Sequence, residues 1–135
     1  MRFLLVTPTT TLRRGNVVTA KRWQGLLRQL GHRAEIARSF GDGEEACDAL
    51  VALHARKSFE SIERFRLQRP SAPLVVALTG TDLYGDLGRS VEAEKALGWA
   101  DRLIVLQRRG LDLLPPHLQD RARVILQSAT ATASP

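Results

Sequence analysis

The fold of this chain is decided by the stretch LVVALTGTD at residues 74–82, in which five apolar residues run directly into a polar, glycine-containing turn. The same pattern occurs in FLLVTP at 3–8 and in LVALHARKS at 50–58. Continuous apolar runs of this length, separated by helical patterns, are typical of parallel strands buried on both faces. We therefore predict a Rossmann-like, doubly wound α/β domain with a mostly parallel sheet of five or six strands.

Helices are predicted between these runs. The first begins near Asn16 or Val17, because apolar residues recur at i, i+3, i+7 and i+10 from Ala20. N-caps of later helices are predicted at Ser58 and Ser90. The predicted strands are residues 2–7, 32–37, 48–53, 74–78, 101–106 and 123–126. We expect the three strands that end in polar clusters to lie side by side, with the first strand central.

Length and composition limit the class of protein. With 135 residues, 44% of them hydrophobic, the chain is expected to form one globular domain. No apolar run approaches the roughly 20 residues that span a bilayer, and the first one is too short for a secretory signal, so we expect a cytoplasmic protein without membrane contact. The single Cys47 excludes an internal disulfide, and no metal-ligand spacing occurs, so neither a metal nor a cofactor is expected.

A net charge of +6 suggests nucleic-acid binding, but the distribution of the charges argues against it. Acidic and basic residues are interleaved, as in Glu60, Glu63, Arg64 and Arg66, which is typical of a solvated helix face. Aromatic residues make up only 5% of the chain and do not accompany a basic patch. We therefore expect no nucleic-acid partner.

The polar clusters after the three apolar runs predict one ligand site. In open α/β sheets, ligands bind beyond the carboxyl ends of the strands. Cations and short hydroxyl side chains dominate these clusters, so we expect an anion pocket there. The candidate binding residues are Arg13, Arg14, Gly15, Asn16, Lys21, Arg56, Lys57, Thr79, Gly80, Thr81 and Asp82, and His54 is the candidate catalytic residue.

Each part of this site has a simpler alternative. Gly15 stands alone, so the first loop is neither a dinucleotide fingerprint nor a phosphate-binding P-loop. The basic residues before it precede a helix N-terminus, which favours an anion, but they could equally form a solvated loop. A single histidine at a strand end is more often structural, and Asp82 could cap a helix. Lys21 is as readily solvated as directed at the pocket.

Several motifs resemble the N-terminal domain of GT-B glycosyltransferases and, in detail, the selenosugar synthases of selenoneine biosynthesis. The matching segments are VTP at 6–8, RRGN at 13–16 with TA at 19–20, LHARKS at 53–58, ALTGTDLY at 77–84, ADRLIVLQ at 100–107 and VILQS at 124–128. The resemblance implies that residues 1–128 form an acceptor-binding domain. It implies that 129–135 are a disordered tail or the start of a linker, and that the C-terminal donor-binding domain is absent.

The resemblance also implies the reaction. A hexose such as N-acetylglucosamine would pass from its UDP form to selenophosphate, and this chain alone would be half of a metal-independent enzyme. Many GT-B relatives carry a histidine where Thr79 stands, which suits an alcohol acceptor that must lose a proton. An anionic selenophosphate needs no base but does need cations. The alternative is a free-standing α/β module that binds phosphate or another anion without catalysis.

Overall fold

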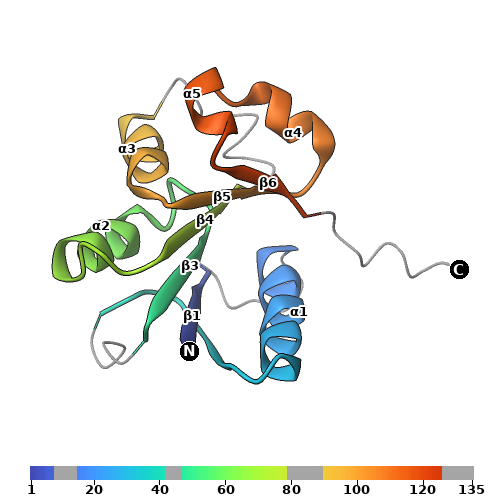
Figure 1. Ribbon diagram of the computed structural model, residues 1–135. Coiled ribbons are helices and arrows are strands. Elements are labelled where there is room, and N and C mark those ends of the chain that lie inside the picture. Colours follow the sequence, from blue (N-terminus) through green and yellow to red (C-terminus); the bar gives the residue numbers. More distant parts are fainter. Residues whose placement is uncertain (8–14, 42–46, 79–89, 126–135) are drawn as a thin grey trace, which may run out of the picture.

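The computed structural model describes residues 1–7, 15–41, 47–78 and 90–125. Within these residues, strands and helices alternate along most of the chain (Figure 1). The elements are β1 (Arg2–Val6), α1 (Gly15–Gln29), β2 (Arg33–Ala37), β3 (Ala49–Leu53), α2 (Phe59–Gln68), β4 (Leu74–Leu78), α3 (Val91–Trp99), β5 (Arg102–Val105), α4 (Arg108–Leu113), α5 (Pro116–Gln119) and β6 (Ala122–Val124).

The strands form one six-stranded sheet in the order β2-β1-β3-β4-β5-β6, and every neighbouring pair is parallel. This confirms the predicted α/β class and the adjacency of the three strands that end in polar clusters. The expectation that the first strand is central is wrong, because β1 lies second from one edge. Only β2 lies beyond it, since the chain crosses back after β2 and adds its four later strands on the other side.

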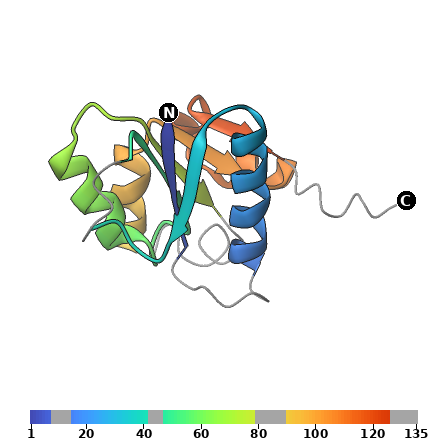
Figure 2. The ribbon, with the colours of Figure 1, turned by 90° about the horizontal axis from the view of Figure 1, so that it is seen from below.

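Helices cover both faces of the sheet, which is the doubly wound arrangement (Figure 2). On one face α1 packs over a cluster that includes Leu5, Ala34 and Leu53. On the other face α2, α3 and the short α4 and α5 cover a larger cluster that includes Phe65 and Leu97. All five residues of β3 are buried, because this strand has a helix layer on each side. This double burial explains the continuous apolar runs in the sequence.

The ends of the helices are fixed by local hydrogen bonds. Ser90 caps α3 as predicted, since its Oγ accepts the backbone N–H of Ala93 at 3.1 Å. Gly31 follows α1 with φ +93°, a conformation that glycine adopts without steric cost. None of the helices in the described ranges is both long and apolar enough to cross a lipid bilayer.

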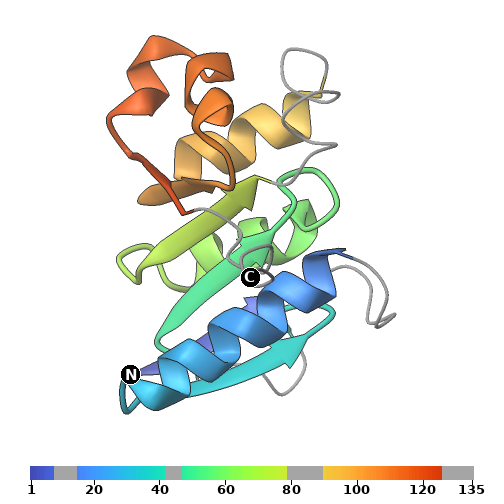
Figure 3. The same ribbon diagram turned by 90° about the vertical axis from the view of Figure 1, so that its right-hand side faces the viewer.

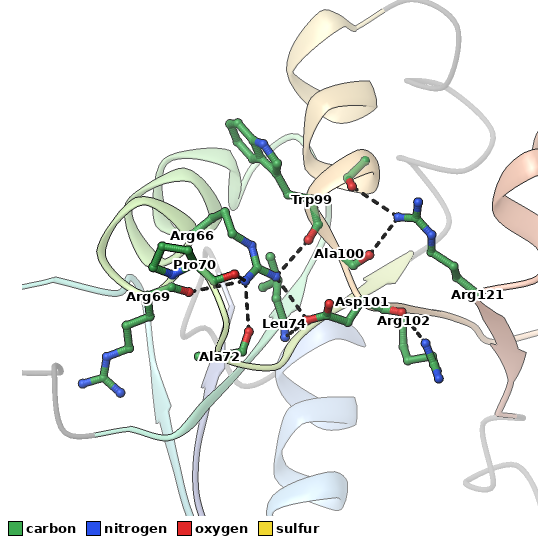
Figure 4. Close-up of polar contacts among 11 residues, drawn as sticks. Arg66, Arg69, Pro70, Ala72, Leu74, Trp99, Ala100, Asp101, Arg102 and Arg121 are labelled. Atoms are coloured by element: carbon green, nitrogen blue, oxygen red, sulfur yellow. Dashed lines mark hydrogen bonds and ion pairs between the residues drawn. The ribbon is translucent and has the colours of Figure 1, made fainter.

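One arginine ties together the amino ends of β4 and β5 (Figure 4). Arg66 of α2 donates through Nη1 to the carbonyls of Arg69, Pro70 and Ala72, at 3.3, 2.8 and 3.0 Å. Its Nη2 donates to the carbonyl of Trp99 at 2.9 Å and to the carboxylate of Asp101 at 3.1 Å.

The same carboxylate of Asp101 completes the junction. Its Oδ2 accepts the backbone N–H of Leu74 at 2.9 Å, and the backbone N–H of Asp101 donates to the Leu74 carbonyl at 2.8 Å. Only 14% of the Arg66 side chain is exposed, whereas the Asp101 side chain is 55% exposed, so the bonds of Arg66 to the carbonyls of Arg69, Ala72 and Trp99 are the better shielded part of this junction. Arg66 therefore holds the end of α2, the turn into β4 and the start of β5 in one arrangement.

We predict that Arg66→Ala lowers the free energy of unfolding by about 2–3 kcal/mol, because several carbonyls and one carboxylate lose a charge-assisted donor. Arg66→Lys should recover less than half of this loss, since an ammonium group cannot reproduce the planar fork. Urea denaturation followed by circular dichroism measures both. Arg108→Ala, at an exposed position of α4, is the control and should change stability by less than about 0.5 kcal/mol. Equal losses of stability for Arg66→Ala and Arg108→Ala would contradict the structural role assigned to Arg66.

Candidate functional site

The carboxyl ends of β1, β3 and β4 lie next to one another at one edge of the sheet. The register places Val6 beside Ala52, and Leu53 beside Ala77. The segments that follow these strands in the sequence therefore leave the sheet from adjacent positions. The boundary between β1 and β3 is also where the strand order reverses, which is the usual position of a ligand crevice in open α/β sheets.

The structure describes only part of the predicted site. Gly15 and Asn16 are the first two residues of α1, the helix that follows β1. His54, Arg56 and Lys57 follow β3 directly. Lys21 lies within α1. The remaining predicted binding residues lie outside the described residues; they are Arg13, Arg14, Thr79, Gly80, Thr81 and Asp82.

His54 is the best-defined side chain of this site. It is 1% exposed and has φ +82°, so its backbone is in the left-handed region. Histidine is one of the few residues besides glycine that is enriched there. This conformation allows the chain to leave β3 and turn at once, and the turn is anchored on both sides. The backbone N–H of His54 donates to the Ala77 carbonyl of β4 at 2.9 Å, and its carbonyl accepts the N–H of Ser58 at 3.1 Å.

The imidazole of His54 is held in one tautomer. Its Nδ1 lies 3.1 Å from the backbone N of Lys57, and a backbone N–H can only donate. Nδ1 must therefore act as an acceptor, and the ring proton of the neutral imidazole is on Nε2. Protonation of Nδ1 would break this bond. The neutral ring therefore has its acceptor at Nδ1 and its donor at Nε2.

Ser58 follows this turn and differs from its predicted role. It does occupy the position before α2, but its side chain makes no capping hydrogen bond. Instead, Oγ donates to the carbonyl of Leu53 at 2.8 Å. The last residue of β3 has a carbonyl at the strand end that needs a donor, and the buried hydroxyl supplies it. Ser58 therefore closes the turn around His54.

The predicted cations in the described part of the site are solvent-exposed. Arg56 and Lys57 both lie on the surface of the turn after β3, and Lys21 is exposed on the second turn of α1. The exposure of Lys21 agrees with its simpler, solvated interpretation. Arg56 and Lys57 lie at the edge where the predicted anion would bind. Because both side chains are exposed, their attraction for an anion should weaken as the salt concentration rises.

Two threonines near this edge were not among the predicted site residues. Thr7 directly follows β1 and is fully buried, and its backbone N–H donates to the Ala37 carbonyl at 2.9 Å. Thr19, one turn into α1, is also buried. A short hydroxyl directly after a buried strand is the sequence signal that identifies Thr7. Thr19 could not be recognised in this way, because it lies within a helix.

The other chemical features of the described residues lie elsewhere. No group of three or more His, Cys, Asp or Glu in these ranges could hold a metal ion. A pocket of about 510 Å³ lies between α3 and the α4–α5 segment, lined by residues that include Glu94, Leu97, His117 and Arg121. It contains none of the predicted site residues.

Comparison with models of known protein families and with curated proteins gives no match to this chain.

We predict that His54→Asn preserves stability to within about 1 kcal/mol, because asparagine tolerates positive φ and its side-chain oxygen can accept the Lys57 N–H. His54→Val should cost about 2–4 kcal/mol, since a β-branched residue is strained at this φ and leaves the N–H unpaired. Urea denaturation measures both values. His117→Val, at an exposed histidine, is the control and should change stability little. A tolerated valine at position 54 would show that the backbone there is not constrained.

Proposed function

We propose that this chain is the acceptor-binding domain of a GT-B glycosyltransferase, a selenosugar synthase that transfers a hexose such as N-acetylglucosamine from its UDP form to selenophosphate. The observation that supports the proposal most strongly is the adjacency of the carboxyl ends of β1, β3 and β4. These strands precede the three polar motifs on which the resemblance to this family rests. An enzyme that binds one small anion needs such motifs at one edge.

The chemistry of the edge suits an anionic acceptor. The N-terminus of α1 at Gly15 presents backbone N–H groups and the positive end of a helix dipole. Lys57 supplies an exposed ammonium group directly after the turn that holds the buried His54. Donors and cations stabilise a phosphate or selenophosphate group, whereas an alcohol acceptor would need a base.

The proposed reaction requires little acid–base chemistry from this domain. The selenium lone pair of selenophosphate attacks C1 of the hexose, a carbon–selenium bond forms, and the bond from C1 to the UDP oxygen breaks, so UDP leaves with the bonding electrons. Water later removes the phosphate from selenium. The domain would bind selenophosphate through its oxygens and direct selenium towards C1 of the sugar, so positioning is its main contribution.

We predict that the chain binds selenophosphate, and inorganic phosphate more weakly, with an affinity that falls as ionic strength rises. Arg14→Ala and Lys57→Ala should each weaken binding roughly tenfold at low salt, because each removes a charge-assisted contact. Isothermal titration calorimetry measures these affinities. Lys95→Ala, an exposed lysine of α3, is the matched control and should bind like the unaltered chain. Unchanged affinity in both test variants would exclude the proposed anion site.

We predict that the chain alone forms no selenosugar from UDP-N-acetylglucosamine and selenophosphate, because the nucleotide sugar has no binding domain to position it. Together with a GT-B donor-binding domain, product should be detectable by mass spectrometry. Loss of Arg14 should then reduce turnover far more than Thr79→Ala, with His54→Ala between them. Product from the chain alone would contradict the proposal that a separate domain must bind the nucleotide sugar. Anion binding with no transfer under any condition would favour the free-standing binding module.

A further inference from the structure

The pocket between α3 and the α4–α5 segment is a second candidate binding site. Figure 1 and Figure 3 both show these helices next to one another. Its volume of about 510 Å³ is within the range of small-molecule sites. Gly98 and Arg121 line it, and they come shortly before the first residues of β5 and β6. This end of the pocket therefore lies towards the amino ends of the strands, whereas the candidate site described above lies at their carboxyl ends.

The apolar part of the pocket combines buried and exposed side chains. Leu97 of α3 and Leu118 of α5 line it and are 1% and 5% exposed. Leu113, at the end of α4, and Pro115 line it from exposed positions. An apolar group bound here would cover part of Leu113, which is otherwise 46% exposed, and removal of this surface from water favours binding.

Gly98 leaves space in this pocket that any other residue would occupy. It lies in the last turn of α3, and its φ is outside the left-handed region, so the backbone conformation does not require glycine. A Cβ at this position would meet no atom within 4 Å, so close packing does not require glycine either. Glycine also lowers helix stability relative to most residues. What it provides here is open space beside Glu94, which lies one turn earlier on the same side of α3.

The positive charge of the pocket is held in a fixed position. Arg121 donates through Nη1 to the carbonyls of Gly98 and Ala100, at 3.2 and 3.0 Å (Figure 4). These carbonyls lie at the C-terminal end of α3, where a cation is favoured. The Nη2 and Nε groups of Arg121 donate to none of the described residues, and no carboxylate among them pairs with it. A guanidinium group fixed in this way, with donors to spare, suits a carboxylate ligand.

The negative charge of the pocket comes from Glu94. This residue is exposed, and its side chain forms no hydrogen bond or ion pair with any described residue. Glu94 and Arg121 thus line one pocket without pairing with each other. A simple anion or a purely apolar ligand would leave the carboxylate unpaired, whereas a ligand with an ammonium and a carboxylate group can pair with both side chains.

We propose that this pocket binds a small zwitterion with an apolar side chain, a free apolar amino acid or a dipeptide of such residues. The ligand carboxylate pairs with Arg121 and the ligand ammonium with Glu94. The apolar side chain lies against Leu97, Leu113 and Leu118. This site is independent of the proposed glycosyl transfer and does not rest on it.

The first test compares ligands that differ in their charged groups. Titration with L-phenylalanine, followed by nitrogen–proton correlation NMR, should give saturable shifts of amide signals in α3 and the α4–α5 segment, with a Kd on the order of 0.1 mM. N-acetyl-L-phenylalanine lacks the ammonium group and L-phenylalaninamide lacks the carboxylate. Each should bind roughly tenfold more weakly, because each loses one charge-assisted contact.

The dipeptide leucyl-phenylalanine distinguishes the two sources of such a zwitterion, since the better-fitting ligand should bind more tightly. Absence of shifts with both zwitterions up to about 10 mM would overturn the proposal. Equal affinity for L-phenylalanine and its two blocked forms would also overturn it.

Two helical glycines provide matched variants. Gly98→Leu should fill the pocket and abolish binding, and it should maintain or raise the melting temperature because it replaces a helical glycine. Gly25→Leu in α1 is the control: a Cβ there also meets no atom within 4 Å, and position 25 does not line the pocket, so binding should be unchanged. Binding retained by Gly98→Leu, or lost equally in both variants, would contradict the proposal.

Glu94→Gln tests the ammonium contact in a pocket that stays open. It should weaken the binding of L-phenylalanine roughly tenfold but should not weaken that of N-acetyl-L-phenylalanine, which has no ammonium group to lose. Glu92→Gln is the control, because Glu92 is an exposed residue of the same helix that does not line the pocket. Equal weakening of both ligands, or of neither, would rule out the role assigned to Glu94.

Discussion

All strands of the sheet run in the same direction, so each connection between neighbours has to cross a face of the sheet before the next strand can begin. The chain makes one such crossing through α1 to reach β2 and then reverses, so that β3 pairs with the other side of β1. The position of the candidate site and the arrangement of the helices both follow from this reversal. It places the carboxyl ends of β1, β3 and β4 together, and it leaves α1 as the only described helix on its face.

The two ends of the sheet are stabilised by different means. At the amino ends, Arg66 and Asp101 form a dense set of hydrogen bonds that joins α2, β4 and β5. At the carboxyl ends, the turn after β3 holds His54 in a left-handed conformation, fixed by its bonds to Ala77 and Lys57. The bonds at the amino ends hold β4 and β5 against α2. The turn at the carboxyl ends holds the His54 ring in a defined position, as binding sites generally require.

The elements of the fold were largely predictable from the sequence, because burial on both faces leaves a direct trace in continuous apolar runs. The position of β1 was not, since local patterns do not record the side of the sheet on which a later strand is added. Ser58 shows a second limit: its hydroxyl could cap α2 or bind the Leu53 carbonyl, and only the three-dimensional path of the turn decides between them.

For the candidate site, the sequence predicted which strand ends lie side by side but not the local geometry of the turns that follow them. The adjacency of the three strand ends follows from the fold class, so His54 and Lys57 could be assigned to one edge from the sequence. The positive φ of His54 and the bond from Lys57 to its Nδ1 could not, because both depend on how the turn is anchored to β4. The burial of Thr19 within α1 could not be predicted either, because a helical position carries no local signal for it.

The composition of α1 also affects how the purified chain behaves in solution. This helix exposes Leu26 and Leu30 and carries basic but no acidic residues, so clustering through its leucines is opposed by charge repulsion, and added salt screens that repulsion. Turbidity that increases with ionic strength would then reflect an exposed contact surface in a folded molecule, not a failure to fold. For this chain, low-salt buffers and acidic co-solutes are the natural conditions for concentrated samples.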